Sequence, residues 1–524
     1  MNTLSDPMRG RAKLARQIGL SIGLAALAVL VLFASQFKKL DHDEHQFIAS
    51  AALLIKNGLF PWLDYPYFHV PYLLVPYALL FQLTDHLLIA ARAFSAFCSL
   101  IMLGLIAVYA SGWFKGDDAR IRVGVAAGSA IMLAGSPSFT YTSGLAWNHD
   151  ASVLLSVAAA LVFLSRGRSP QLKNFVSGTL LGLAIGTRLT VLPLVAPFLA
   201  ACFLLREGDR PLRQSILALA TFGSGLLLAL VPLFVILAAA PDEFIFGNFG
   251  YPALNTLYRE ASGYSRAMSL PLKILFFLER VLADPGNLII YAFLIFVLIR
   301  IGAKLVIRVQ DRELSFLLAL IVFSFAGSLA PTPSFKQYFY APLPFIVLAG
   351  IRGMALLRDR AEWKQVQRLF VAALVICFLR GAVGYWAIFQ PGTSKSAVTA
   401  QAHRLGREVS QAVGDGGILT LSPIIPLEGG LDIYEEFVTG PFAWRVAALL
   451  APEERERKRM TSPAELGSLL RERPPAGILL GLEIDDLEQP LLDFARATGY
   501  QALSLSGGVK LWLPTDPGHG EDQR

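Results

Sequence analysis

Long apolar runs separated by short polar loops make up about the first three quarters of the chain. Eleven of these runs reach or approach the roughly 17 to 25 residues that a helix needs to cross a bilayer. The expected spans lie at residues 17–37, 86–112, 123–142, 151–165, 174–187, 189–205, 214–239, 286–303, 314–330, 338–351 and 369–390. The pattern therefore predicts a polytopic α-helical membrane protein.

One further apolar segment, residues 68–83, is too short and too interrupted to count as a span. Pro71 and Pro76 remove backbone hydrogen bonds within it. Its tyrosines are typical of an aromatic belt at a membrane surface. We expect a helix that lies at the outer interface, because counting it as a span would invert every later loop.

The pattern changes after about residue 391. Short apolar runs at 417–423, 477–483 and 509–514 alternate with polar segments of helical character. This alternation is typical of a small α/β domain. We therefore divide the chain into a transmembrane domain, residues 1–391, and a soluble α/β domain, residues 392–524.

Composition agrees with this division and excludes a soluble enzyme. Hydrophobic residues make up 54% of the 524 residues and charged residues only 16%, and the mean hydropathy is +0.54. The net charge of +7 does not indicate a nucleic-acid partner, because the basic excess is confined to the membrane part. Up to residue 391 there are 33 Lys and Arg and 20 Asp and Glu. After residue 391 there are 13 Lys and Arg and 19 Asp and Glu. The three cysteines lie in apolar runs and suggest neither a disulfide framework nor a zinc site.

The basic residues of the loops predict the orientation. With a cytoplasmic amino terminus, 22 of the 33 fall in inside loops and nine in outside loops, as the positive-inside rule requires. An odd number of spans then places the C-terminal domain in the periplasm or its equivalent, in a multi-pass protein of the bacterial inner membrane. We interpret the first run as an uncleaved anchor; a cleaved signal peptide is the alternative.

Acidic residues gather at two points on the predicted outer face. Asp41, Asp43 and Glu44 lie within the four positions 41–44, shortly after the first span, and Asp150 lies at the start of the fourth span. Carboxylates packed this closely raise one another's pKa, as in catalytic bases and metal sites. The alternatives are a solvated loop for the first group and a helix cap for Asp150.

Cations are predicted on the same face: Arg188, Arg259, Arg266 and Lys336. Each by itself is typical of a side chain that extends from a helix end to water. Together with the carboxylates they suit glycosyl transfer from a lipid-phosphate sugar, in which a base deprotonates an acceptor hydroxyl while cations hold the departing phosphate. In an inverting displacement these two groups act on opposite faces of the sugar.

Four sequence pieces resemble the membrane-embedded GT-C glycosyltransferases that use polyprenyl-phosphate sugars, which include bacterial lipid A aminoarabinose transferase and the protein O-mannosyltransferases. They are the acidic pair Asp43-Glu44 with its continuation to NGLFPWLDY, the segment DASVLL from Asp150, the turn GLAIGTRLTVLPL, and KQYFYAPLPF from Lys336. The resemblance covers most of the membrane region and implies a GT-C-like fold of about 11 spans with outer interfacial helices.

The resemblance also implies roles for residues. Asp43 would be the general base with Glu44 supporting it, and Asp150 would position the acceptor or bind a metal. Lys336, Arg188 and Tyr338 would serve the donor phosphate. The chain departs from the aminoarabinose transferase where His69-Val-Pro replaces Lys-Pro, so that one phosphate contact is lost or moves to His69.

Asp41 is the alternative candidate for the general base. We place Asp43 first because an acidic residue follows it directly and Phe47 comes four positions later.

Metal ligands are not identified, and the sequence implies no certain cofactor, although a divalent metal is compatible with it. The expected partners are a polyprenyl-phosphate sugar donor, a glycolipid, glycan or protein acceptor, and membrane lipid, with no nucleic acid.

Two other classes of function share some of these features. A transporter or flippase of a lipid-linked sugar would also have many spans and basic inside loops, but it would place ionisable groups at mid-membrane and show repeated halves. Only Arg92 and Arg380 lie well inside predicted spans; Arg300 lies near the end of the span 286–303. A scaffold whose outer domain binds a partner would leave the acidic loop unexplained.

Overall fold

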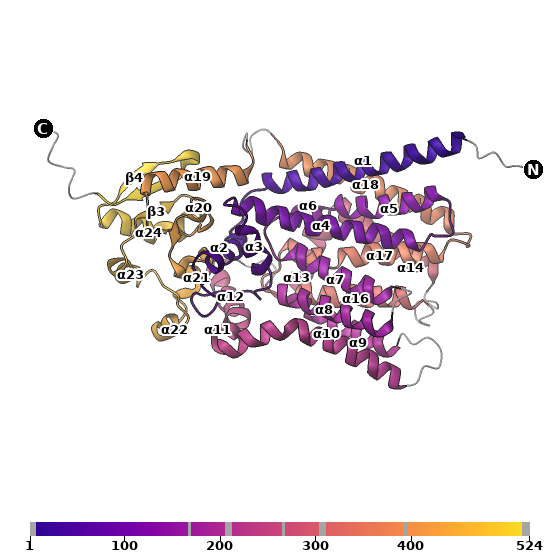
Figure 1. The fold of residues 1–524 in the computed structure, drawn as a ribbon, viewed down its shortest axis with the longest axis horizontal. Coiled ribbons are helices and arrows are strands. Elements are labelled where there is room, and N and C mark those ends of the chain that lie inside the picture. The colour runs from indigo at the N-terminus through magenta and orange to yellow at the C-terminus, as the bar shows by residue number, and fades with distance from the viewer. Residues whose placement is uncertain are drawn as a thin grey trace, which may run out of the picture.

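The protein, described here from a computed structural model, consists of a long helical bundle with a small α/β domain at one end (Figure 1). The structure describes residues 7–165, 169–204, 212–264, 268–302, 311–390 and 396–515. The start of α1 (Pro7–Phe37) and the C-terminal domain lie at opposite ends of the bundle (Figure 1). The predicted fold class, a helical membrane protein with a C-terminal α/β domain, is confirmed.

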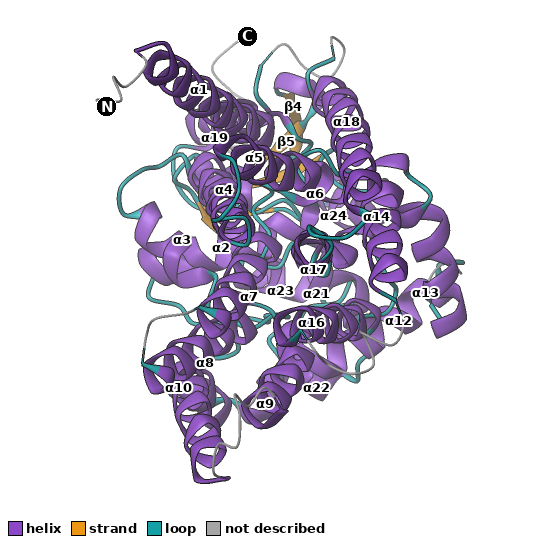
Figure 2. Ribbon diagram, turned by 90° about the vertical axis from the view of Figure 1, so that its right-hand side faces the viewer, coloured by secondary structure: helices purple, strands orange, loops and turns teal. Residues whose placement is uncertain are grey.

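Each predicted span corresponds to a helix or to a pair of consecutive helices. They are α1 (Pro7–Phe37), α4 (Leu87–Gly112), α5 (Ala119–Ala134) with α6 (Pro137–Thr142), α7 (His149–Leu164), α8 (Pro170–Thr187), η1 (Leu189–Leu194) with α9 (Val195–Leu204), α10 (Leu212–Ala239), α14 (Pro285–Ile301), α16 (Arg312–Leu329), η4 (Lys336–Tyr340) with α17 (Leu343–Leu356), and α18 (Trp363–Ile388). Figure 2 views this bundle nearly along its helices.

Fewer of these helices are long and apolar enough to cross a bilayer by length and composition alone. Among the described residues, five continuous segments meet that requirement, or up to seven if two bent pairs each count as one span. The apolar helix α7 and the joined η1 and α9 are shorter. The structure thus supports a multi-pass protein, while the count of eleven stays a prediction.

Short helices collect at the end of the bundle that faces the C-terminal domain (Figure 1). The chain turns by 94° between α1 and α2 (His42–Lys56), and by 104° between the segment Leu270–Leu282 and α14. The others are α3 (Leu74–Phe81), α11 (Pro241–Ile245), η2 (Phe246–Gly250), α12 (Tyr251–Ala261), and α13 (Leu270–Phe277) with η3 (Leu278–Leu282). These turns lay α2 and the segment Leu270–Leu282 across the end of the bundle.

Two expectations about helices need correction. The expected continuous span at 123–142 is broken, because Pro137 begins α6 and the Ser136 side chain caps it by accepting from the Phe139 N–H. In the expected interfacial helix at 68–83, only Leu74–Phe81 is helical. Pro76 falls in its first turn, where no backbone donor is needed.

The C-terminal domain contains one five-stranded sheet in the order β2-β1-β3-β5-β4. The strands are β1 (Gly417–Leu419), β2 (Asp432–Ile433), β3 (Gly477–Leu480), β4 (Gln501–Ser504) and β5 (Lys510–Leu513). The first three are parallel, and β5 runs antiparallel to both β3 and β4. The three apolar runs that predicted strands form β1, β3 and β5.

Helices surround this sheet and connect its strands. They are α19 (Val398–Val413), α20 (Ile424–Glu428), η5 (Glu435–Phe437), α21 (Pro441–Ala447), α22 (Pro452–Arg457), α23 (Leu466–Glu472), α24 (Asp485–Ala497) and η6 (Ser506–Gly508). The domain boundary predicted near residue 391 falls between α18 and α19, in residues 391–395, which lie outside the described ranges.

Polar contacts join the domain to the short helices of the bundle. Lys56 of α2 donates to the Gly430 carbonyl at 2.8 Å and to Asp432 Oδ1 at 2.9 Å. The buried His45 places Nε2 3.5 Å from Glu483 Oε1. The C-terminal domain therefore rests directly on α2, the helix that begins with the acidic residues.

Candidate active site

A buried ion pair organises the loop between α1 and α2. The Arg92 side chain of α4 is fully buried and donates to both Glu44 oxygens, at 2.8 and 2.6 Å. It also donates to the carbonyl oxygens of Ser35, Lys38 and Lys39 at 2.9, 2.7 and 3.1 Å. Arg92 thus fixes the end of α1 against the start of α2.

The Glu44 carboxylate also accepts hydrogen bonds from two backbone N–H groups. Its Oε2 accepts from the Asp41 N–H at 3.1 Å, and its Oε1 accepts from the Ala146 N–H at 2.8 Å. With these donors and Arg92, both oxygens are occupied inside the protein. The geometry therefore suits the supporting role expected for Glu44 and leaves it no capacity to act as a base.

Asp41 is the N-cap of α2. Its Oδ1 accepts from the Asp43 N–H at 2.9 Å, and with Glu44 it forms a capping box. Burial, and after it the charge of Asp43, raises the pKa of the Asp41 carboxyl to about 6. Asp41 is thus committed to the helix terminus.

Asp43 is the carboxylate of this loop that remains open. Its side chain is 30% exposed and lies 3.7 Å from His42 Nε2. Within the described part of the chain it accepts no hydrogen bond, and its charge acts on Arg188, Tyr338 and Tyr251. Asp43 and Asp41 are the two candidates for the general base, and this environment favours Asp43.

Asp150, the second acidic point, is buried. It accepts from Ser99 Oγ at 2.6 Å and from the Gly144 N–H at 2.7 Å. Gly144 has φ +76, and a Cβ there would lie 2.5 Å from the Ser35 side chain, so this loop approaches α1 closely. Because both carboxylate oxygens have partners, the geometry favours a positioning role over direct contact with an acceptor.

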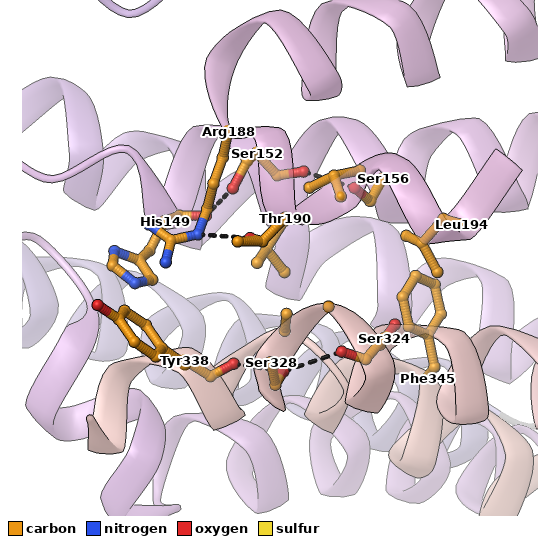
Figure 3. A pocket seen from close by; sticks show the side chains of 14 residues that line it. His149, Ser152, Ser156, Arg188, Thr190, Leu194, Ser324, Ser328, Tyr338 and Phe345 are labelled. Carbon is orange, nitrogen blue, oxygen red and sulfur yellow. Dashed lines mark hydrogen bonds between the residues drawn. The ribbon is translucent and has the colours of Figure 1, made fainter. Parts of the chain in front are cut away.

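A cleft opens between α7, η1, α16 and the η4–α17 segment (Figure 3). It holds about 420 Å³ of atom-free space, its open mouth included. Gly327 of α16 shapes it, because a Cβ at this position would lie 2.1 Å from the Thr190 carbonyl oxygen. Arg188, His149 and Tyr338 lie at one end of the cleft, and Leu194 and Phe345 lie at the other (Figure 3).

Arg188 is held rigidly at the polar end. Its Nε donates to Thr190 Oγ1 at 2.9 Å and one terminal nitrogen donates to Asn148 Oδ1 at 2.6 Å. Asn148 is fixed in turn by its bond to the Thr187 carbonyl at 3.2 Å. The guanidinium also lies 5.1 Å from the centre of the Tyr338 ring.

His149 completes the polar end. Its ring stacks on Tyr338 with centroids 6.2 Å apart, and it is only 6% exposed. Neither ring nitrogen has a hydrogen-bond partner within the described residues. A buried polar group without a partner is costly, so a cation beside an unpaired imidazole indicates a site for an anionic ligand.

The other predicted cations are Lys336, Arg259 and Arg266, and the first two are not among the described residues that line the cleft. Lys336 begins η4 with an exposed side chain and does not line the cleft. Arg259 of α12 lies 5.5 Å from the Tyr264 ring, and its buried Nε has no partner in the described ranges. Arg266 lies outside the described residues.

The C-terminal domain contributes a cation that sequence reasoning missed. Arg445 of α21 donates to the Tyr251 hydroxyl at 2.8 Å and lies 4.5 Å from the Phe442 ring. Its charge acts on Arg259 and lowers the pKa of that guanidinium, though less than burial does. No local motif marks Arg445 or His149, and Asp150, next to His149, is the residue of that segment that the sequence indicates.

His69 lies beside the cleft. Its ring stacks on Phe47 with centroids 5.1 Å apart. Burial, and after it the charge of Arg188, lowers the pKa of His69 to about 3, so the imidazole is neutral and offers a hydrogen bond without a charge. A phosphate contact by His69 stays a prediction.

One group of residues near the cleft could hold a metal ion. Asp41, His42 and Asp43 offer ligand atoms that all lie within 4.8 Å of one another. Carboxylate oxygens suit Mg²⁺ or Mn²⁺, but Asp41 already uses one oxygen for the helix cap. A divalent metal at this position stays a prediction.

Comparisons with known proteins agree with the fold. The family described as dolichyl-phosphate-mannose-protein mannosyltransferase matches residues 69–236. The crystal structure of ArnT from Cupriavidus metallidurans bound to undecaprenyl phosphate is similar, with a TM-score of 0.63 and 14% identity over 95% of this chain and 98% of that one. The apo state of the same protein gives a TM-score of 0.62 with the same identity and coverage.

A weaker likeness is to the cryo-EM structure of the arabinofuranosyltransferase AftD from mycobacteria, with a TM-score of 0.47 and 14% identity over 94% of this chain and 40% of that one. No curated protein sequence matches the chain. The likeness to ArnT over nearly the whole chain shows a shared fold, and the family that matches residues 69–236 is one of mannosyltransferases.

The Arg92–Glu44 pair yields a test of stability. Arg92→Ala leaves the Glu44 carboxylate buried without its counterion, and we expect the free energy of unfolding to fall by about 3 to 5 kcal/mol. Thermal unfolding of the purified protein in detergent measures the change.

The matched control is Lys56→Ala, which breaks an ion pair whose side chains are 41% and 55% exposed. Exposed pairs contribute about 1 kcal/mol or less. Equal losses of stability in the two variants would contradict the organising role of Arg92.

Proposed function

We propose that the protein transfers a sugar from a polyprenyl-phosphate donor to an acceptor hydroxyl on the outer face of the membrane, with inversion. The observation that carries the proposal is the separation of two charges: an open carboxylate, Asp43, and a cleft whose polar end contains Arg188 with the unpaired His149. The fold shared with ArnT, a protein crystallised with undecaprenyl phosphate, supports it.

The cleft suits a lipid phosphate because its two ends differ in polarity. Arg188, His149 and Tyr338 offer donors for phosphate oxygens, and Leu194 and Phe345 offer apolar contacts for the first part of the lipid chain (Figure 3). Arg188 is already fixed by Thr190 and Asn148, so little reorganisation is needed as negative charge develops on the departing phosphate.

In the proposed reaction the acceptor oxygen forms a bond to the anomeric carbon as the bond from that carbon to the phosphate oxygen breaks. Asp43 takes the hydroxyl proton, and the bonding electron pair leaves with the polyprenyl phosphate, which Arg188 stabilises. Inversion requires the base and the leaving group to act from opposite faces of the sugar. The acceptor is a glycolipid, a polysaccharide or a protein; lipopolysaccharide is one candidate.

The remaining predicted residues have supporting roles in this scheme. Glu44 and Asp150 both accept from backbone N–H groups of the loop before α7, at Ala146 and Gly144. Arg259 adds positive charge near Tyr338, and Lys336 and Arg266 are further candidates for holding the donor phosphate. A divalent metal at Asp41, His42 and Asp43 would occupy the Asp43 carboxylate, so a metal at this position and a role of Asp43 as base exclude each other.

Transport of a lipid-linked sugar is less well supported. Its expected signature is an ionisable group at mid-membrane that serves the substrate. The two charged residues well inside predicted spans both have acidic partners: Arg92 pairs with the buried Glu44, and Arg380 pairs with Asp284 at 2.9 Å.

Asp43→Asn tests the base. Removing a general base lowers turnover by about 10²- to 10⁴-fold, and we expect a loss of that size in kcat with purified enzyme and a polyprenyl-phosphate sugar. Thermal unfolding should be unchanged, because the Asp43 side chain accepts no hydrogen bond within the described residues.

Asp41→Asn is the control for the base, since asparagine caps a helix about as well as aspartate. It should keep most of the turnover. Loss of turnover in Asp41→Asn together with normal turnover in Asp43→Asn would transfer the role of base to Asp41.

The donor site is tested by Arg188→Ala compared with Lys336→Ala. We expect Arg188→Ala to lower kcat/KM for the donor by at least about tenfold, because a hydrogen bond to a charged group contributes about 1.5 to 3 kcal/mol. The exposed Lys336 should matter less, since water screens its charge. An unchanged kcat/KM in Arg188→Ala would exclude phosphate from this cleft.

The proposed orientation places the amino terminus in the cytoplasm and the C-terminal domain outside the inner membrane. The three native cysteines are buried, so single introduced cysteines report accessibility with little background. In intact spheroplasts, a membrane-impermeant maleimide should label Ser468→Cys of the C-terminal domain and spare Lys115→Cys at the other end of the bundle. The reverse pattern would overturn the orientation and the outward-facing site with it.

A further inference from the structure

A second group of chemically active side chains lies where the C-terminal domain meets the bundle. Asp85 and His86 directly precede α4, His403 lies on α19, and Glu428 ends α20. The rings of His86 and His403 have centroids 3.8 Å apart. We call these four residues the seam cluster; the proposed sugar transfer does not use it.

Glu428 orients His403. The Glu428 side chain is 2% exposed, and its Oε2 lies 2.7 Å from His403 Nδ1. Its Oε1 accepts from the Leu88 N–H at 2.7 Å, which anchors the carboxylate to the start of α4. With Nδ1–H donated to Glu428, His403 Nε2 is left with a lone pair, the arrangement commonly found around metal-binding histidines.

His86 presents the second imidazole. Its Nδ1 is buried and has no hydrogen-bond partner within the described residues. Its Nε2 lies 3.9 Å from Asp85 Oδ1. One ligand atom from each of Asp85, His86 and His403 lies within 4.8 Å of the others, so one ion could contact all three.

We propose that Asp85, His86 and His403 bind one divalent ion of the Zn²⁺ type, with Glu428 as the positioning residue. Two imidazoles and a carboxylate are ligands that Zn²⁺ prefers, and a water molecule completes four-coordinate geometry. Because two ligands come from the bundle and one from the C-terminal domain, the ion fixes the domain to the bundle.

The chemistry of the ligands distinguishes this site from the group at Asp41, His42 and Asp43. That group has one imidazole and two carboxylates, and one carboxylate oxygen caps α2. The seam cluster has two imidazoles, one of them oriented by a buried carboxylate. A borderline ion such as Zn²⁺ therefore favours the seam cluster.

The test is the metal content of the full-length protein in detergent after removal of any affinity tag, stripping with a chelator, incubation with ZnCl₂ and desalting. We expect one Zn²⁺ per chain for the wild type and for His42→Ala, and loss of that Zn²⁺ in His86→Ala and in His403→Ala. Glu428→Gln should weaken Zn²⁺ binding by about 10- to 100-fold, as loss of an outer-shell partner does.

A second measurement protects the test against misfolding of a variant. Zn²⁺ should raise the Tm of the wild type and of His42→Ala but leave the Tm of His86→Ala unchanged, with all three eluting alike in size exclusion. Retention of Zn²⁺ in both His86→Ala and His403→Ala would overturn the proposal, as would loss of Zn²⁺ in His42→Ala alone. Neither result depends on sugar transfer, so the proposed function is tested separately.

Discussion

The buried pair between Arg92 and Glu44 is the interaction on which the end of the bundle facing the C-terminal domain depends. Two opposite charges with almost no exposure are stable only when every donor and acceptor is used, and here the donors and acceptors come from the end of α1, the start of α2, α4 and the loop before α7. The pair therefore joins segments that are far apart in sequence. It also decides which acid of the loop is free, because Glu44 and Asp41 become structural and Asp43 is left open.

A second constraint is the separation of charge across the candidate site. Arg188 is held by neutral partners, Thr190 and Asn148, and Asp43 faces it without a direct ion pair in the described part of the chain. If the two were paired, each would neutralise the other and neither could act on a substrate. Keeping them apart leaves both the proposed base and the proposed phosphate site free for a substrate. Asp43 lies at the start of α2, after the turn of 94° that separates α2 from α1.

The C-terminal domain takes part in this arrangement. It lies on α2, and it brings Arg445 to Tyr251 and His403 to His86. Arg445 increases the positive charge near Arg259, so the domain contributes to the electrostatics of the site and does not only cover it.

The sequence by itself determined the helical class, the positions of the predicted spans and the change to an α/β domain, because hydrophobic periodicity and run length reflect local burial and the solvent around each segment. It also indicated Asp43 and Arg188 through their resemblance to a family. Only the tertiary structure decided that Asp150 is enclosed by Ser99 and Gly144, that His149 stands unpaired beside Arg188, and that the seam cluster forms at all. Apart from the contact of Gly144 with Asp150, those facts depend on residues tens to hundreds of positions apart, and hydrophobic periodicity does not report such contacts.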